Sequence, residues 1–408
     1  MGTYSLPASQ DLALLKTPIV LETLASGAEL SARNRLAIQP MEGADGEAEG
    51  SPGELTIRRY DRFAESGAAL LWFEAVAIRH EGRANPRQLW LHKKNVESYK
   101  RIVSRIREKA AKERGLDPII IMQATHSGRY SKPESEFVPI IACNNPIFEK
   151  ERPLSADRII SDDELKRLEE EYAAVTRLAM SAGFDGIDIK ACHRYLISEL
   201  LSAHSRPGIY GGSLENRMRF FLNCIENARV VADKNFAITS RMNIYDGFPY
   251  PYGFGSIEGE ELEPDLGEAI SVVKATKFSF INITMGNPYV NPQVNRPTET
   301  AAVERMYSLT KQVKAACPEV KFIASAPTFM KEESGSLCAG AIEQGYADMV
   351  GFGRMAFAYP HFARDIMEGQ FDKKQTCICC GKCTELMRAS QAGCAVRDPL
   401  YTKLYQEL

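Results

Sequence analysis

The residues of this chain whose types and spacing best suit chemistry are five cysteines within eighteen residues near the C-terminal end. They are Cys377, Cys379, Cys380, Cys383 and Cys394, and the other five cysteines are scattered along the chain. With the spacing C-x2-C-x2-C-x10-C, four thiolates can converge on one centre, three of them from a single tight turn. Such compact spacing favours a cubane iron–sulfur cluster. The pattern predicts a protein that moves single electrons.

A structural zinc site is the alternative, because zinc also accepts four thiolates. Zinc sites more often use two separated C-x2-C pairs, so the spacing favours the cluster. The predicted ligands are Cys377, Cys380, Cys383 and Cys394, which leaves Cys379 as the spare thiol. Residues 1–22 lack the basic stretch and continuous apolar core of a secretory signal. We therefore expect a cytoplasmic protein whose thiols stay reduced.

Composition places the chain among ordinary globular proteins. It has 408 residues, of which 44% are hydrophobic and 25% charged. A net charge of −3 and a pI near 6.2 provide no basic field for nucleic acid. We expect no membrane span, since no run of eighteen apolar residues occurs. Six histidines are few for a site built from several of them.

Apolar, β-branched runs alternate with helical stretches, which is the pattern of a parallel α/β sheet. Eight runs are candidate strands: residues 36–40, 69–74, 118–123, 186–190, 236–241, 278–284, 320–325 and 347–352. Their nearly continuous hydrophobicity is typical of strands that are covered on both faces. Eight such units in one chain predict an α/β fold of the (β/α)8 TIM barrel type.

One helix can be bounded from the sequence. Ser161 and Glu164 form a capping box for a helix over residues 162–182, and Gly183 follows as its stop. Long loops are expected at residues 130–153 and 245–264, after the third and fifth strands, where barrels build their active sites. We expect residues 1–365 to form the barrel and residues 366–408 to form a cysteine-rich extension packed against it.

Several stretches carry a resemblance to a known family. Residues 184–202 and 210–217, with Pro40-Met41 and residues 123–129, 287–297 and 351–354, resemble the old yellow enzyme family of flavoproteins. The resemblance covers nearly the whole chain in the family's order. With the cysteine tail added, it is similar to the iron–sulfur branch that includes 2,4-dienoyl-CoA reductase and trimethylamine dehydrogenase. The expected cofactors are therefore FMN and a 4Fe-4S cluster.

The resemblance implies which residues would hold the flavin. Arg354 would bind its phosphate, beside loop residues Ser325 and Gly353, although a surface salt bridge is the alternative for this arginine. Gln123 would meet the pyrimidine edge, since an amide both donates and accepts. Either Arg217 or Arg241 would be the cation near N1, unless Arg217 caps a helix or pairs with Glu215. Pro40 and Met41 would offer backbone contacts near the ring.

The resemblance also implies three catalytic residues. Tyr195 would protonate the carbanion left when hydride reaches an activated alkene. His193 would hydrogen-bond the substrate's carbonyl oxygen, beside Lys190, where the family usually has His or Asn. As a full cation, Lys190 could hold a carboxylate or enolate, or instead pair with Asp188. Glu42 is a second departure, since relatives often have Cys, Thr or His after Pro-Met.

The leading hypothesis is an ene-reductase that delivers hydride from flavin N5 to an α,β-unsaturated carbonyl or carboxylate compound. The alternative is an amine dehydrogenase or demethylase that passes electrons out through the cluster. An aromatic cage for its ammonium substrate could come from Tyr245, Phe248, Tyr250 and Tyr252. A third hypothesis is a non-catalytic barrel with structural zinc.

The expected partners follow from the chain's extent. Larger relatives carry a dinucleotide-binding region after the cluster, whereas this sequence ends at Leu408, fourteen residues past Cys394. We therefore expect an external electron donor, which would be a ferredoxin, a flavodoxin or a separate reductase. Direct reduction by NAD(P)H stays open, because simpler family members use it. A homo-oligomer is expected from the resemblance alone.

Overall fold

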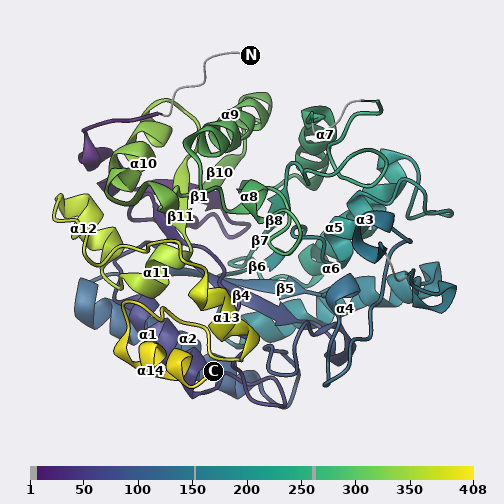
Figure 1. Cartoon of the computed structure of the whole chain (residues 1–408), viewed down its shortest axis with the longest axis horizontal. Helices are drawn as coiled ribbons and strands as arrows, with labels where there is room; N and C mark the ends of the chain where they lie inside the picture. The colour runs from purple at the N-terminus through teal and green to yellow at the C-terminus, as the bar shows by residue number, and fades with distance from the viewer. Residues whose placement is uncertain (1–6, 151–152, 260–262) are drawn as a thin grey trace.

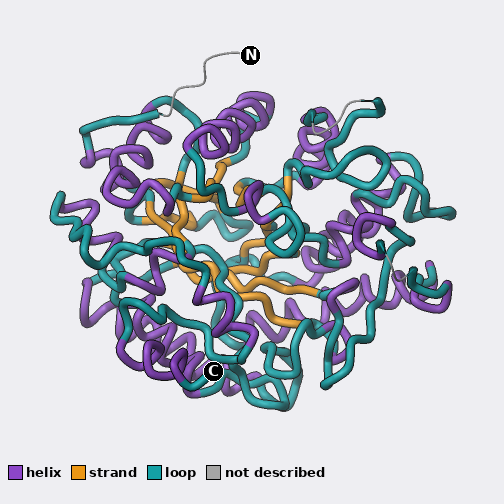
Figure 2. Tube along the Cα trace, in the orientation of Figure 1, coloured by secondary structure: helices purple, strands orange, loops and turns teal. Residues whose placement is uncertain are grey.

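The computed structural model describes residues 7–150, 153–259 and 263–408, and its centre is a nine-stranded sheet of parallel neighbours. Figure 1 shows the strands surrounded by helices, and Figure 2 shows the same strands gathered in the middle of the molecule. The strands are β3 (Leu36–Ile38), β4 (Leu70–Ala77), β5 (Ile119–Thr125), β6 (Gly186–Ile189), β7 (Ala237–Thr239), β8 (Arg241–Asn243), β9 (Phe280–Thr284), β10 (Lys321–Ser325) and β11 (Met349–Phe352).

The sheet closes on itself. Its spatial order runs from β7 through β6, β5, β4, β3, β11, β10 and β9 to β8. The two end strands are consecutive in the chain and are separated only by Ser240, so they form one interrupted barrel strand. The Ser240 hydroxyl donates to the Ile189 carbonyl at 2.7 Å, and the Ser240 backbone carbonyl accepts from the Asn282 N–H at 2.9 Å. Eight strand positions therefore make the predicted (β/α)8 barrel, and this prediction is confirmed.

Helices cover the outside of the barrel. They are α1 (Glu54–Ala64), α2 (Val96–Arg114), α4 (Asp162–Ser181), α6 (Leu214–Val231), α7 (Leu266–Thr276), α9 (Thr300–Ala316), α10 (Ser334–Glu343), α11 (Arg354–Ala358) and α12 (Phe362–Glu368). The predicted start of α4 is confirmed, because the Ser161 side chain accepts from the Glu164 N–H at 3.1 Å. Shorter helices α3 (Pro146–Glu149), α5 (Leu196–Leu201) and α8 (Pro292–Asn295) lie in connections that follow barrel strands.

An antiparallel hairpin before the barrel was not predicted from the sequence. Its strands are β1 (Ile19–Thr23) and β2 (Glu29–Ala32). Leu21 and Leu30 from this hairpin share a buried cluster with Trp72, Phe280 and other inward side chains of the barrel strands. The hairpin therefore supplies apolar cover for the barrel interior, which stabilises it by burying that surface.

The cysteine tail lies against the barrel's helical ring. It contains α13 (Lys382–Arg388) and α14 (Pro399–Gln406), both drawn in yellow in Figure 1, where α14 lies beside α1. Asp398, at the start of α14, binds Arg58 of α1 through two hydrogen bonds of 2.7 and 2.9 Å. The Arg58 guanidinium also lies 5.2 Å from the centre of the Tyr401 ring.

No helix among the residues that the structure describes is long and apolar enough to cross a membrane. The predicted long loops include residues 151–152 and 260–262, which lie outside the described residues.

Candidate active site

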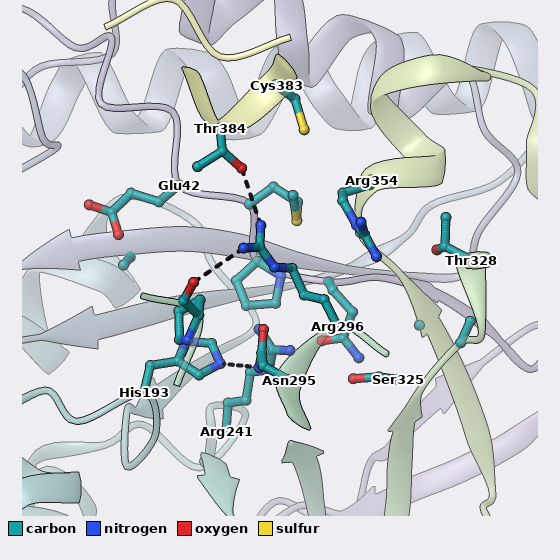
Figure 3. Close-up of a pocket in the computed structure, with 18 of the residues that line it drawn as sticks. Glu42, His193, Arg241, Asn295, Arg296, Ser325, Thr328, Arg354, Cys383 and Thr384 are labelled. Carbon is teal, nitrogen blue, oxygen red and sulfur yellow. Dashed lines mark hydrogen bonds between the residues drawn. The ribbon is translucent and has the colours of Figure 1, made fainter. Parts of the chain in front are cut away.

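One pocket gathers most of the residues singled out from the sequence. It lies at the carboxyl ends of the barrel strands, and Figure 3 shows side chains pointing into it from several of them. Its lining includes Pro40, Met41, Gln123, Lys190, His193, Tyr195, Arg241, Ser325, Gly353, Arg354 and Cys383. Parallel strands of a barrel point their carboxyl ends to one face, which is why residues so distant in sequence meet here.

Arg217 does not belong to this group. It lies near the start of α6, where its guanidinium forms a salt bridge with Glu268 and donates to the Leu201 and Gly212 carbonyls. Its charge is therefore neutralised outside the pocket lining, and the pairing partner is Glu268 rather than Glu215. Of the two arginines considered for the cation near a flavin, only Arg241 lines the pocket.

Arg241 is a buried cation that lacks a carboxylate partner among the described residues. It is the first residue of β8, and its side chain is only 8% exposed. Its Nε has no hydrogen-bond partner, and burial lowers the pKa of its guanidinium. A buried donor of this kind carries a desolvation cost that a negatively charged or carbonyl-bearing ligand would relieve.

Asp188 of β6 holds Gln123 in place beneath the pocket. Its Oδ2 accepts from the Gln123 amide at 2.6 Å and from the Trp72 indole N–H at 2.7 Å. Its Oδ1 accepts from the backbone N–H of Arg241 at 2.6 Å. With one amide hydrogen used on Asp188, Gln123 keeps a second hydrogen and its oxygen for a ligand.

The opposite part of the pocket offers a cationic cradle with room for a ligand close to the backbone. Arg354 begins α11, and the described residues provide it with no ion pair or hydrogen bond. A Cβ added at Gly353 would approach the Met41 sulfur to 2.7 Å, so a larger residue would displace that side chain. Figure 3 shows Arg354 on the same side of the pocket as Ser325 at the end of β10.

Tyr195 is the most connected residue of the site. Its hydroxyl donates to Glu42 Oε2 at 3.0 Å and lies 3.1 Å from the Tyr289 hydroxyl. The Lys190 ammonium lies 3.6 Å from the centre of the Tyr195 ring, a cation–π contact. Burial, followed by the neighbouring Glu42, raises the pKa of Tyr195, which keeps the phenol protonated. No ion pair joins Lys190 to Asp188 in the part of the chain described.

His193 is held in one orientation and kept neutral. Burial is the main cause that lowers its pKa, and Arg241 and Lys190 add to the effect. Asn295 Nδ2 lies 3.1 Å from His193 Nε2 and also donates to the Met285 carbonyl at 3.0 Å. Because a carbonyl only accepts, that Asn295 atom is the amide nitrogen, and its two hydrogens serve His193, the Met285 carbonyl and the Thr284 hydroxyl, which lies at 3.1 Å. The His193 backbone has φ of 64°, in the left-handed region.

All five tail cysteines line a second, smaller cavity together with Arg354 and Phe357. Cys383 lines both cavities, so the two adjoin. Thr384 and Met387 of α13 also form part of the main pocket's wall. Among the described residues, no three His, Cys, Asp or Glu side chains are placed to hold a single metal ion.

The pocket residues that received no role from the sequence include Tyr289, Asn295 and Arg296. Arg296 donates to the Thr384 hydroxyl and to the Pro288 carbonyl, both at 3.2 Å. The signal available was the stretch 287–297, which contains all three and was noted only for its resemblance to the family. Conversely, the described residues of the two long loops are absent from the pocket lining, and so are Tyr245, Phe248, Tyr250 and Tyr252.

Barrels with a pocket at the carboxyl ends of their strands have many activities, so the family of the chain decides its class. The chain belongs to the NADH:flavin oxidoreductase / NADH oxidase family, whose sequence model matches residues 26–373. Family membership supports FMN as its cofactor.

Two of its relatives have different activities. A probable N-methylproline demethylase of Rhizobium meliloti is 26% identical over 283 residues, covering 68% of this chain and 39% of the relative. Cinnamate reductase of Clostridium sporogenes is 26% identical over 250 residues, covering 59% of this chain and 36% of the relative. The chain thus spans less than half the length of either protein. The structure of 2-naphthoyl-CoA reductase with 2-naphthoyl-CoA superposes with a TM-score of 0.78 at 18% identity. The superposition covers 97% of this chain and 58% of that one, and it shows that the two share a fold.

Proposed function

We propose that this flavin-dependent oxidoreductase is an ene-reductase that uses FMN and a 4Fe-4S cluster. The observation that carries the proposal is the Tyr195 hydroxyl, buried in the pocket beside Lys190 and the neutral His193. A protonated phenol next to two donors suits a reaction that creates negative charge on a substrate and then protonates it.

The residues of the main pocket fit FMN. Arg354 and Gly353, with Ser325, would hold its phosphate, and Gln123 and Arg241 would meet the pyrimidine edge. The unpartnered Nε of Arg241 is explained by such a ligand. When bound, FMN supplies the hydride that reduces the alkene.

The chain's own residues would prepare and protonate the substrate. Lys190 and His193 would donate to its carbonyl or carboxylate oxygen, which draws electron density away from the double bond. Tyr195 would then give its hydroxyl proton to the carbon that has become a carbanion. Lys190, against the Tyr195 ring, would stabilise the resulting phenolate.

The tail residues fit a cluster. A cubane takes one thiolate at each of four irons, so its ligands stand farther apart than the ligands of a single ion. The five cysteines that share one cavity could supply those thiolates. When bound, the cluster supplies single-electron transfer. Cys377, Cys380, Cys383 and Cys394 remain the predicted ligands from spacing, and a ferredoxin, flavodoxin or separate reductase the proposed donor, with NAD(P)H as the alternative.

The amine dehydrogenase alternative draws support from the demethylase relative. The pocket argues against it, because Lys190 and Arg296 would remain for the substrate once FMN had engaged Arg241 and Arg354, and Glu42 is the one carboxylate that the described residues place in the lining. Cations repel an alkylammonium substrate and attract a carboxylate or enolate. The four aromatic residues considered for a cage also lie outside the lining.

An anaerobic half-reaction separates the two activities. The holoprotein is reduced with dithionite and mixed with enones, enoates and cinnamate-type acids, and the oxidised form is mixed with alkylamines. Reoxidation of the flavin by an alkene supports the ene-reductase. Bleaching of the oxidised flavin by an amine, with no alkene response, moves the assignment to the dehydrogenase. Iron and acid-labile sulfide in equal amounts support the cluster, whereas zinc without sulfide rejects it.

A further inference from the structure

Glu42 is the one carboxylate that the described residues place in the lining of the main pocket. It follows Pro40 and Met41, directly beyond β3. Figure 3 shows it across the pocket from Arg354 and Ser325. Its Oε2 accepts the hydroxyl proton of Tyr195 at 3.0 Å, although the two residues stand 153 positions apart. The only acid of the pocket is thus joined to the proposed proton donor.

Tyr195 needs a source from which to regain its proton after each turnover. Its two hydroxyl partners are Glu42 and Tyr289. Tyr289 is a phenol whose own pKa is raised by burial, so a proton transfer from it to a tyrosinate gains no free energy. A carboxylic acid is stronger than a phenol by roughly 6 pKa units, so transfer from Glu42 is downhill. Glu42 is therefore the effective source.

We propose that Glu42 acts through Tyr195 as its proton reservoir, an inference that rests on the proposed ene-reductase function. The O–H bond of Tyr195 breaks and its proton forms the new C–H bond at the substrate carbanion. The O–H bond of the Glu42 carboxylic acid then breaks, and its proton restores the Tyr195 hydroxyl along the existing hydrogen bond. The Glu42 carboxylate regains a proton from hydronium or a buffer acid of the solvent, which leaves as water or the conjugate base, and no electrons move in these steps.

The surroundings of Glu42 favour a protonated carboxyl. Desolvation raises the pKa of Glu42, and Lys190 and the Tyr195 hydrogen bond only partly oppose the rise. Tyr289 faces it from the connection after β9, with Arg296 close by. On the other side, the N–H of Gly43 donates to Glu74 at 2.7 Å, and Glu74 is paired with Arg59. Because burial raises the pKa of Glu74 to about 7, that residue titrates as well.

The test compares the wild-type holoprotein with Glu42→Gln. Glutamine keeps a hydrogen bond to Tyr195 but cannot release a proton. With dithionite in excess as the reductant, each protein turns over one alkene repeatedly across pH, and the steady-state rate of alkene consumption is recorded, since only repeated turnover requires Tyr195 to regain its proton. In the wild type we expect the rate to fall about tenfold per pH unit above the pKa of Glu42, because the charged form holds no proton. Glu42→Gln should be slower by about 10- to 100-fold and lack that fall.

Two further measurements keep the test decisive. Glu42→Asp keeps an acid, so its rate should still fall as pH rises. Glu74 titrates in all three proteins, so its titration does not distinguish them. Infrared spectra taken across pH should show a carboxylic acid C=O band that titrates in the wild type and is missing in Glu42→Gln. The same pH profile in both proteins, or no such band, overturns the reservoir. A wild-type protein that no alkene reoxidises overturns the proposed function instead, whatever the infrared result.

Discussion

At the scale of single residues, the Tyr195 hydroxyl is the group on which the proposed chemistry depends. Tyr195→Phe removes that hydroxyl and keeps the ring that Lys190 contacts. We expect the alkene half-reaction to slow by about 10²- to 10⁴-fold, because general acid catalysis is lost. Reduction of the flavin by dithionite should stay near the wild-type rate. Stopped-flow absorbance of each half-reaction measures both.

Tyr130 provides a matched control for this variant. Its ring centre lies 5.8 Å from that of Tyr195, and its hydroxyl accepts from Asn287 at 2.8 Å, but it is outside the pocket lining. Tyr130→Phe should therefore leave both half-reactions within about threefold of wild type. If Tyr195→Phe slowed the two half-reactions equally, the proton-donor role would be wrong.

At the scale of elements, the turn after β5 contains a histidine whose protonation opposes folding. His126 is buried, and its Nδ1 accepts from the N–H of Gly128 at 3.1 Å. Burial lowers the pKa of His126 to about 4, below its ordinary value of 6.5. Between those values the unfolded chain binds a proton that the folded chain refuses, so stability falls as pH falls.

This depression gives a prediction of pH-dependent stability. The His126 contribution should lower the free energy of unfolding by about 2 kcal/mol from pH 7 to pH 5. His126→Asn keeps an acceptor for Gly128 but does not titrate, so its loss over that range should be smaller by this amount. Urea unfolding of both proteins at the two pH values makes the measurement. Equal losses would assign the pH dependence to other groups.

The cysteine tail gives a second prediction at this scale. Cys383 lines both cavities, whereas Cys379 is the spare thiol by spacing. Cys383→Ser should lose most of its iron and acid-labile sulfide while FMN is retained, because a cluster corner loses its thiolate. Cys379→Ser is the matched control and should keep iron at the wild-type level. Unchanged iron in Cys383→Ser, or loss in Cys379→Ser, would contradict the ligand assignment.

At the scale of the whole molecule, the tail is attached to the barrel through Asp398. This residue is buried, pairs with Arg58 and Arg62 of α1, and accepts from the N–H of Leu400 as the N-cap of α14. Asp398→Asn keeps a capping side chain but removes the charge, whereas Asp398→Ala removes both. The free energy of unfolding should be about 1 kcal/mol lower in Asp398→Ala than in Asp398→Asn, which is the usual contribution of an N-cap.

In each Asp398 variant, the weaker attachment of the tail should lower both the free energy of unfolding and the iron content. We expect the free energy of unfolding to fall by about 2 kcal/mol in Asp398→Asn, because two arginines lose their shared partner. Urea unfolding and the iron retained after gel filtration report the two effects. Unaltered stability in both variants would show that the tail is held by apolar contacts alone, such as those of Leu386 and Tyr401.

Several levels of the fold were predictable from local pattern. Barrel strands covered on both faces read as continuous apolar runs, which is why β5 and β9 were found close to their observed bounds. The start of α4 was visible because a capping box is a contact within four residues. The interruption at Ser240 and the hairpin of β1 and β2 were not visible, because both depend on pairing with distant strands.

The sequence by itself determined the barrel, the family and a set of site residues of which most line one pocket, since each of these depends on periodicity or on a contiguous motif. Only the tertiary structure decided that Arg217 is neutralised by Glu268 while Arg241 stays unpartnered. Likewise, only folding brings Glu42 to the hydroxyl of Tyr195. A hydrogen bond needs atoms within about 3 Å. No local pattern reports distances between segments that meet only at the carboxyl ends of the strands once the barrel has closed.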